Sequence, residues 1–142
     1  MDRQVEESIL KAHPIIYSRL FARLPDGQYF ECGDGWQHIL LALSRKLENE
    51  ALRLAHEHAD LSPTDEPPLY VAQVKEEFAG LRVHVKGGPI SNKVRGWLVT
   101  AEDESRHICE ICGATGTTRQ RQSRGIRTLC DAHAASEGYV ES

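Results

Sequence analysis

Residues 109–133 read CEICGATGTTRQRQSRGIRTLCDAH, and this stretch decides how the C-terminal part of the chain folds. It contains Cys109 and Cys112 as a Cys-x2-Cys pair, a gap of seventeen residues, and then Cys130 and His133 as a Cys-x2-His pair. Three thiolates and one imidazole at this spacing predict a closed tetrahedral zinc site. Because four protein ligands leave no coordination position for water or substrate, we expect a structural Zn²⁺ and a protein that is not an enzyme.

The residues around these ligands predict the local backbone. Gly113 follows the second cysteine, where the chain often needs a positive φ. Cys130 precedes Asp131 and several alanines that suit a first helical turn, and a helix N-terminus favours a thiolate. Residues 114–129 are rich in Gly, Thr and Ser, which suits a hairpin. This order of knuckle, hairpin and helix resembles a treble-clef zinc finger over residues 107–138.

Other interpretations of these residues stay open. The four residues could be unrelated, or two cysteines could form a disulfide, although disulfides belong to oxidising compartments and nothing in the sequence indicates secretion. His107 could replace one ligand, but it lacks the paired spacing. A sulfur-rich site also accepts iron in place of zinc. Cys32 stands alone, and we expect a buried free thiol rather than a reactive one.

The size and composition of the chain are those of an ordinary soluble protein. Of the 142 residues, 40% are apolar and 27% are charged. The length predicts one domain with a small appended module, which we divide into a main body (residues 1–105) and a zinc-binding module (residues 106–142). No apolar run approaches the roughly 20 residues of a membrane span, and the acidic start MDRQVEE does not resemble a signal peptide. We therefore expect a cytoplasmic location.

Apolar periodicity predicts helices in the first part of the chain. Residues 4–24 have a helical pattern that Pro14 should break or kink. The clearest helix begins near Trp36, with Asp34 as its expected N-cap, and should end near His58. Its solvent-facing side is expected to hold these charged residues: Arg45, Lys46, Glu48, Glu50 and Arg53.

Alternating residues predict two short strands, Tyr70–Lys75 and Leu81–Lys86, joined by a hairpin connection over residues 76–80. Turn-forming and proline-rich sequences predict a turn at residues 25–27 and a loop at residues 59–68.

The last helix of the main body should begin after Ser91, which can act as its N-cap, and run to about Ser105. The resulting fold class is α+β, with helices packed on a small antiparallel sheet and a C-terminal treble-clef-like zinc module at its edge. A sheet of two strands is marginal alone, so the zinc hairpin or an extended piece at residues 29–32 is expected to enlarge it.

The net charge of −4 argues against general nucleic-acid binding, but the charge is unevenly distributed. Residues 117–130 contain no acid and four arginines, which are Arg119, Arg121, Arg124 and Arg127. These arginines either balance the anionic zinc–thiolate cluster on a solvated hairpin, or contact phosphates or an acidic protein partner. We weigh the first interpretation above the second.

Taken together, several motifs resemble a group of small uncharacterised proteins from bacterial and phage genomes. The motifs are Gly33-Asp34-Gly35-Trp36, then the VKEEFAGLR segment at 74–82, Ala101-Glu102 with Ser105, and the two cysteine-containing segments at 109–113 and 128–133. The resemblance implies a bacterial or viral origin, a bacterial or host-cell cytoplasm, and support for the zinc assignment. Many small phage proteins bind and disable a host machine, so the resemblance also implies an inhibitor of a host or defence complex.

Three functions follow from these observations. The first is a zinc-stabilised protein-binding module, in which an exposed aromatic such as Phe78 would anchor a partner of unknown identity, while Trp36 and Trp97 are expected in the core. The second is a nucleic-acid-binding zinc finger that uses the arginines. The third is a His-metal-type nuclease, but residues 113–129 contain no His, Asp, Glu or Asn to build a hydrolytic site. The first function is the one we predict.

Overall fold

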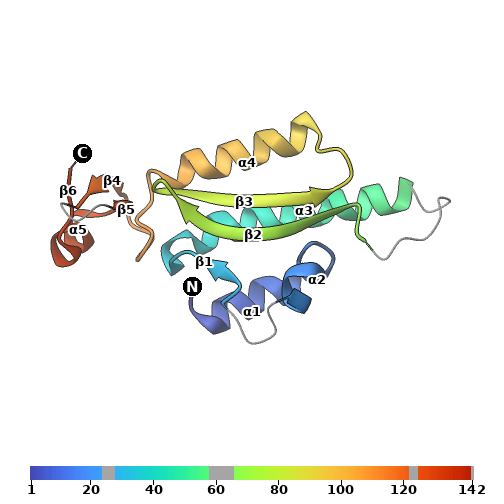
Figure 1. The fold of residues 1–142 in the computed structure, drawn as a ribbon, viewed down its shortest axis with the longest axis horizontal. Helices are drawn as coiled ribbons and strands as arrows, with labels where there is room; N and C mark the ends of the chain where they lie inside the picture. Colours follow the sequence, from blue (N-terminus) through green and yellow to red (C-terminus); the bar gives the residue numbers. More distant parts are fainter. Residues whose placement is uncertain (24–27, 58–65, 122–124, 142) are drawn as a thin grey trace.

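The computed structural model describes residues 1–23, 28–57, 66–121 and 125–141, with an α+β arrangement (Figure 1). The order of its elements is α1 (Arg3–Ala12), α2 (Pro14–Arg23), β1 (Phe30–Glu31), the 3-10 turn η1 (Asp34–Trp36), α3 (Gln37–Glu57), β2 (Leu69–Glu77), β3 (Gly80–Gly87), α4 (Asn92–Ser105), β4 (Thr117–Gln120), β5 (Ile126–Leu129), α5 (Asp131–Glu137) and β6 (Val140–Glu141). The turn predicted at residues 25–27 and most of the loop predicted at 59–68 lie outside the described residues. The division at residue 105 stays a prediction.

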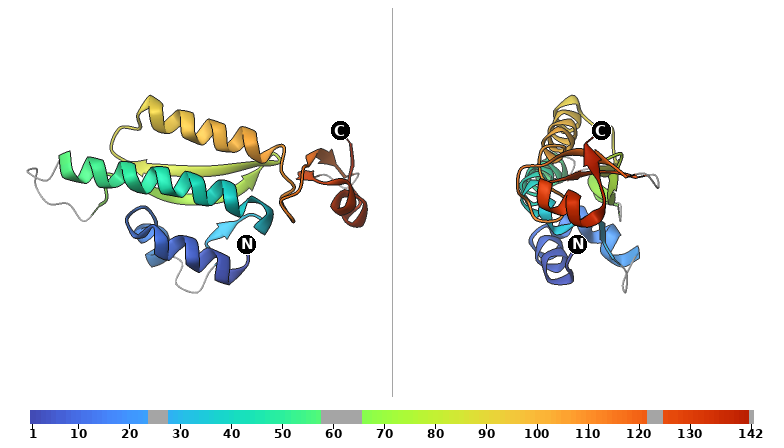
Figure 2. Two further views of the ribbon diagram at one scale, coloured as in Figure 1. Left: turned by 180° about the vertical axis from the view of Figure 1, so that it is seen from behind. Right: turned by 90° about the vertical axis from the view of Figure 1, so that its left-hand side faces the viewer.

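One sheet, of order β1-β2-β3, organises the N-terminal two thirds of the chain. Helices α3 and α4 lie against one of its faces, and α1 and α2 pack beside β1 and β2 (Figure 2). The predicted antiparallel pairing holds for β2 and β3, but β1 pairs with β2 in parallel. The sheet is therefore mixed, and the extended piece predicted at residues 29–32 is the segment that enlarges it. The core between these layers includes Trp36, Phe30, Leu40 and Leu47, which are fully buried.

The break between α1 and α2 falls where the sequence predicts it. α1 ends at Ala12 and α2 begins at Pro14, because proline at the first helical position has no amide hydrogen to lose. The next two amides of α2 find an acceptor on another helix. The Glu48 carboxylate accepts from the amides of Ile15 at 3.1 Å and Ile16 at 3.0 Å. The prediction that Glu48 faces solvent is wrong, because its side chain caps α2.

Replacing Glu48 with alanine is expected to destabilise the protein by about 1–3 kcal/mol, since it leaves the buried amide of Ile16 and the partly buried amide of Ile15 without an acceptor. Chemical unfolding of the variant measures this loss. Arg45→Ala is the matched control on an exposed position of the same helix, and should change the free energy of unfolding by less than about 0.5 kcal/mol. Equal losses in the two variants would contradict the capping role.

The prediction that Asp34 is the N-cap of α3 is wrong. Asp34 begins η1, and its carboxylate accepts a hydrogen bond from the Asp2 amide at 2.6 Å, so it ties the start of the chain to this turn. A 3-10 turn leads directly into α3 at Gln37. Asp34 does not act as the N-cap of α3 because its carboxylate oxygen accepts from the amide of a residue 32 positions away in sequence.

An irregularity in β2 changes which residues face the core. Val71 pairs with Val85 and Val74 pairs with Val83, so β2 has one more residue than β3 in this stretch. This β-bulge breaks the strict alternation that the sequence suggests, and Val71 and Val74, three residues apart, are both fully buried. Ala72 and Gln73, at the bulge, are half-buried.

The turn between β2 and β3 is shorter than predicted. The strands run to Glu77 and from Gly80, so only Phe78 and Ala79 connect them. Both residues have positive φ, 51° and 66°, as a tight hairpin of this kind requires. For a bulky residue such as Phe78 this conformation is strained. Ala79 is fully buried, whereas Phe78 is 68% exposed.

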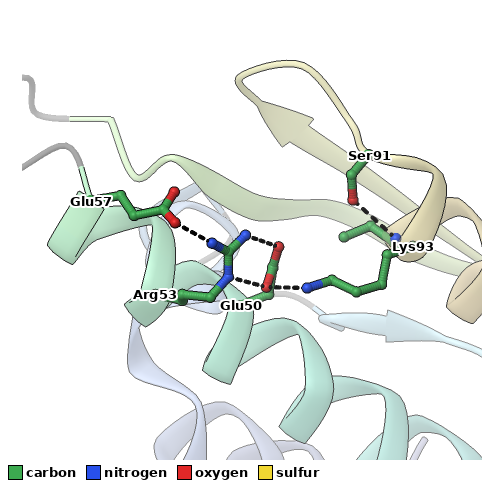
Figure 3. A network of polar contacts seen from close by, with 6 residues as sticks. Glu50, Arg53, Glu57, Ser91 and Lys93 are labelled. Carbon is green, nitrogen blue, oxygen red and sulfur yellow. Dashed lines mark hydrogen bonds and ion pairs between the residues drawn. The ribbon is translucent and has the colours of Figure 1, made fainter.

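A charged network joins α3 to the start of α4 (Figure 3). The Glu50 side chain is only 5% exposed and accepts from the Arg53 guanidinium at 2.8 Å and from Lys93 Nζ at 2.9 Å. Lys93 follows Ser91, whose hydroxyl caps α4 as predicted by accepting from the Val94 amide. Glu50 was expected on the solvent face, and its burial is a second correction to the helix pattern.

This network predicts a pH-dependent term in stability. Hydrogen bonds from Arg53 lower the pKa of Glu50 from 4.5 to about 2, with burial opposing the shift and Lys93 supporting it. A carboxylate with a depressed pKa stabilises the fold above its unfolded-state pKa, and the gain disappears as the pH falls from about 4.5 to about 2. We expect a contribution of about 1–2 kcal/mol, because solvent screens the half-exposed Arg53 and Lys93.

The measurement is the difference in unfolding free energy between the wild type and Glu50→Gln, followed from pH 6 down to about 2.5. Protonation of other groups affects both proteins equally, so the difference isolates Glu50. We expect it to shrink as the pH falls. A difference that stays constant through this range would show that Glu50 is not held ionised by its neighbours.

Candidate metal centre

The four predicted ligands come together at one end of the molecule. Their donor atoms all lie within 4.8 Å of one another. The Cys112 and Cys130 sulfurs are 3.8 Å apart, and His133 Nδ1 lies 3.7 Å from the Cys109 sulfur and 3.2 Å from the Cys130 sulfur. These separations are those of donors at the corners of a tetrahedron around an ion bound at about 2.0–2.3 Å. The group could therefore hold a metal ion.

A tight turn presents the first pair of ligands. The Cys109 amide donates to the Ala114 carbonyl at 2.7 Å, and the Gly113 amide donates back to the Cys109 carbonyl at 2.9 Å. Gly113 has a φ of +83°, which confirms the predicted need for glycine. The turn leaves Cys109 fully buried and Cys112 exposed.

A strand and a short helix present the second pair. β4 and β5 form the antiparallel hairpin expected between the two pairs, and β5 ends at Leu129. Cys130 is then the N-cap residue of α5, as predicted, and His133 lies in the first turn of that helix. The Cys130 side chain makes no capping hydrogen bond, so its sulfur stays directed to the cluster.

The backbone around the cluster favours negative sulfur. Burial opposes ionisation of Cys109, but hydrogen bonds from the backbone of Cys130, Cys112 and Ile111 outweigh it, and the pKa of Cys109 falls to about 6. A backbone hydrogen bond from Ala114 acts to lower the pKa of Cys112, but partial loss of solvent and the neighbouring Cys109 and Cys130 sulfurs together outweigh it, so the pKa of Cys112 is raised. Thiolates crowded this closely repel one another unless a cation lies among them, and a dication satisfies this donor set.

The apolar core around the cluster is small. It consists of Cys109, Leu129, Ala134 and Tyr139, with Ile111 and Cys130 packed against them. The main core of the protein is separate from this cluster. We use the name C-terminal module for residues 106–141. So few buried side chains supply little of the free energy needed to order a module of this size, which is where a bound metal would contribute.

The segment Gly33-Asp34-Gly35-Trp36 is the seam that joins the main body to this module, and the sequence alone did not assign it that role. The Gly35 amide donates to the Glu110 carbonyl at 2.7 Å, and Trp36 Nε1 donates to the Ile108 carbonyl at 2.9 Å. A side chain on Gly35 would collide with the backbone of Cys109 and would lie 2.6 Å from the Glu110 carbonyl. The two glycines flanking an acid, directly before a tryptophan, are the signal that could have indicated close backbone contact.

Glu110, which belongs to the module, stabilises the same contact between the module and the main body. Its side chain is almost fully buried, accepts from the Gly33 amide at 3.0 Å and forms an ion pair with Arg127 at 3.1 Å. Glu110 lies between two metal ligands in sequence, so its position depends directly on the knuckle. The main body thus contacts the knuckle through backbone and buried polar groups that require a fixed geometry.

The β2–β3 hairpin forms the second part of the seam. The Thr128 hydroxyl donates to the Ala79 carbonyl at 2.7 Å, and both residues are fully buried. The Leu81 amide donates to Ser105 Oγ at 2.8 Å. Glu102 forms ion pairs with Arg82 and with Arg106. The motifs that carry the resemblance to bacterial and phage proteins therefore meet at one place, where the main body joins the module.

The predicted arginine patch is largely engaged in contacts within the chain. Arg119 is buried and forms an ion pair with Asp131 at 2.6 Å, and Arg127 is bound to Glu110. The Arg121 guanidinium lies over the Tyr139 ring, 5.2 Å from its centroid. Arg124 lies outside the described residues. These contacts favour the interpretation in which the arginines stabilise the module.

The other candidate residues lie apart from the cluster. His107 is exposed and is not part of the group of ligands, and among the described residues no second group of three or more potential ligands comes together. Cys32 is buried, and burial, with the nearby charge of Glu110, raises its pKa to about 12. Cys32 is therefore a buried free thiol, as predicted, and a thiol in this environment is not expected to react.

No protein-family model matches the chain, and comparisons with curated proteins and with solved structures found no match. The resemblance to small bacterial and phage proteins therefore stays a prediction. Within the described part of the chain, none of the helices combines the length and the apolar character that crossing a bilayer requires.

Proposed function

We propose that the chain is a zinc-stabilised protein-binding module without catalytic activity. The observation that carries the proposal is the convergence of four protein donors, Cys109, Cys112, Cys130 and His133, within 4.8 Å. Three sulfurs and one imidazole nitrogen suit Zn²⁺ in a treble-clef-like site, and they fill its four positions. Zinc bound there would supply folding energy and fix the knuckle against Gly35 and Trp36.

The exposed aromatic at the hairpin turn supports the binding role. Phe78 is 68% exposed and sits in a backbone conformation that costs free energy for a bulky residue. Its neighbour Ala79 is held by Thr128 at 2.7 Å and by the Glu76 carboxylate at 2.8 Å, so the ring is presented from a rigid support. Exposed aromatics on rigid elements are typical anchors of protein interfaces.

The identity of the partner rests on the resemblance alone. We propose a protein of the bacterial cell, and an inhibitor of a host or defence complex is the form of this role that the resemblance to phage proteins suggests. The contacts of Arg119, Arg121 and Arg127 within the chain weigh against the nucleic-acid alternative, because their charges already have acidic or aromatic neighbours.

The test is affinity capture from a nuclease-treated bacterial lysate with the zinc-loaded protein and two variants. Phe78→Gly removes the ring and relieves the positive-φ strain, so it should be at least as stable as the wild type while it loses about ten-fold or more in partner affinity. Leu52→Ala is the control, since Leu52 is 42% exposed on α3, away from the turn. Capture that vanishes after nuclease treatment, or that ignores the loss of Phe78, would contradict the proposal.

A further inference from the structure

The three cysteines of the candidate metal centre differ in their access to solvent. Cys109 is fully buried, Cys130 is half-buried and Cys112 is exposed. The three residues that follow Cys112, which are Gly113, Ala114 and Thr115, are small and also exposed. No bulky neighbour in sequence therefore shields Cys112. Because oxidation of a cysteine requires access to its sulfur, a dissolved oxidant reaches Cys112 before the other two ligand sulfurs.

Cys130 is placed to react with Cys112 in a second step. The two sulfurs are 3.8 Å apart, and a disulfide bond brings two sulfurs to about 2.05 Å. The Cys130 side chain makes no capping hydrogen bond to α5, so its rotation toward Cys112 breaks no hydrogen bond of the helix. The Cys109 side chain instead packs in the core of the C-terminal module with Leu129 and Tyr139. Cys130 is therefore the better partner for Cys112.

We propose that the metal centre is also an oxidation switch, in which a hydroperoxide joins Cys112 to Cys130 in a disulfide and the zinc ion is released. The inference rests on the zinc site of the proposed function and adds a form of regulation to it. Two of the four ligands are consumed by the reaction. The remaining two, Cys109 and His133, are too few for a closed tetrahedral site.

The two steps of the reaction balance without a further reactant. The Cys112 sulfur attacks one peroxide oxygen, so an S–O bond forms, the O–O bond breaks and hydroxide leaves. The Cys130 sulfur then attacks the Cys112 sulfur, so an S–S bond forms, the S–O bond breaks and a second hydroxide leaves. The two thiolates lose two electrons and the peroxide gains them. Both hydroxides take their protons from solvent.

Oxidation of the knuckle also affects the contact with the main body. The Glu110 carbonyl, between the first two ligands in sequence, accepts from the Gly35 amide at 2.7 Å. The Ile108 carbonyl, next to the first ligand, accepts from Trp36 Nε1 at 2.9 Å. Release of the ion changes the knuckle that holds both acceptors in place. The indole N–H of Trp36 therefore reports on the switch, and that of Trp97 on α4 is an internal control.

The test treats the zinc-loaded full chain with hydrogen peroxide. At about one molar equivalent we expect release of about one zinc ion per chain, measured with a metal-binding dye, and rebinding after treatment with a phosphine reductant. Trypsin cleaves after Arg119 and Arg127, which separates residues 107–119 from residues 128–142. In the unreduced digest these two peptides should be joined through Cys112 and Cys130. The indole signal of Trp36 should shift in the NMR spectrum, and that of Trp97 should not.

Two variants test the role of Cys112. Cys112→His keeps four zinc ligands but removes the exposed sulfur, so it should release zinc about ten-fold more slowly or less. Cys32→Ala is the control, because Cys32 lies outside the ligand group, and it should release zinc at the wild-type rate. The peptide analysis uses the wild type and does not depend on the folding of either variant.

Several results would overturn this inference and leave the zinc-stabilised binding role intact. One is zinc that stays bound in about ten-fold excess of peroxide. Others are a disulfide contained within residues 107–119, a disulfide to Cys32, or release from Cys112→His as fast as from the wild type. A chain that binds no zinc before oxidation would overturn both the inference and the zinc site on which it rests.

Discussion

Replacing Gly35 with alanine is expected to destabilise the protein by about 3 kcal/mol or more. The added methyl group would clash with backbone atoms, and such a clash cannot be relieved by rotating a side chain. The new methyl carbon would collide with the Cys109 carbonyl oxygen and lie 2.6 Å from the Glu110 carbonyl. Two hydrogen bonds fix this approach, from the Gly35 amide at 2.7 Å and from Trp36 Nε1 at 2.9 Å. Movement that relieves the clash would break both.

Gly96→Ala is the matched control for Gly35→Ala. Gly96 lies within α4, and a Cβ added there would meet nothing within 4 Å. Alanine in a helix is favoured over glycine, so this variant should be more stable by up to about 1 kcal/mol. Urea unfolding of the two variants beside the wild type measures both effects. Similar midpoints for Gly35→Ala and the wild type would show that the module does not sit against this segment.

Removing the metal is expected to have the largest effect of any perturbation. Zinc binding to small finger domains is worth about 10–16 kcal/mol near neutral pH, and the module's own buried core is only a few side chains. We expect a strong chelator to unfold the C-terminal module. The core built on β2 and α3 should remain, since it is separate from the metal cluster. Residues 33–36 should also become less ordered, because unfolding of the module removes the Ile108 and Glu110 oxygens that accept their hydrogen bonds.

Hydrogen–deuterium exchange before and after chelation measures this response along the chain. The amides of β4, β5 and α5 should lose protection, followed by those of Gly33 and Gly35, whose acceptors lie on Glu110. Cys112→Ser should reproduce the chelated pattern, whereas Cys32→Ala should bind metal normally because Cys32 lies outside the ligand group. Unchanged protection of α5 after complete metal removal would show that the ion does not hold the module together.

Much of the candidate site could be predicted because its signals are local. The ligand spacing, the positive φ at Gly113 and the helix that begins after Cys130 each depend on a few adjacent residues. The same holds for the helix boundary at Pro14 and for the Ser91 cap. Local rules of this kind depend on backbone geometry that the neighbouring residues fix, whatever the rest of the fold does.

The remaining features depend on contacts between distant segments. Glu48 and Glu50 have the composition of a solvent-facing helix surface, yet one caps α2 and the other is paired with Lys93, 43 residues away. The bulge in β2 cannot be read from residue types, because it appears only in the register with β3. The seam around Gly35 is likewise a contact with a segment more than 70 residues later in the chain, so no local pattern specifies it.

X-ray absorption at the zinc edge, on protein with a measured metal content, reports directly on the atoms bound to the ion. We expect one zinc ion per chain, with three sulfur atoms at about 2.3 Å and one nitrogen atom at about 2.0 Å. We expect no oxygen neighbour, because Cys109, Cys112, Cys130 and His133 would fill every position. Protein that folds without stoichiometric metal, or a zinc ion with a bound water, would contradict a closed structural zinc site.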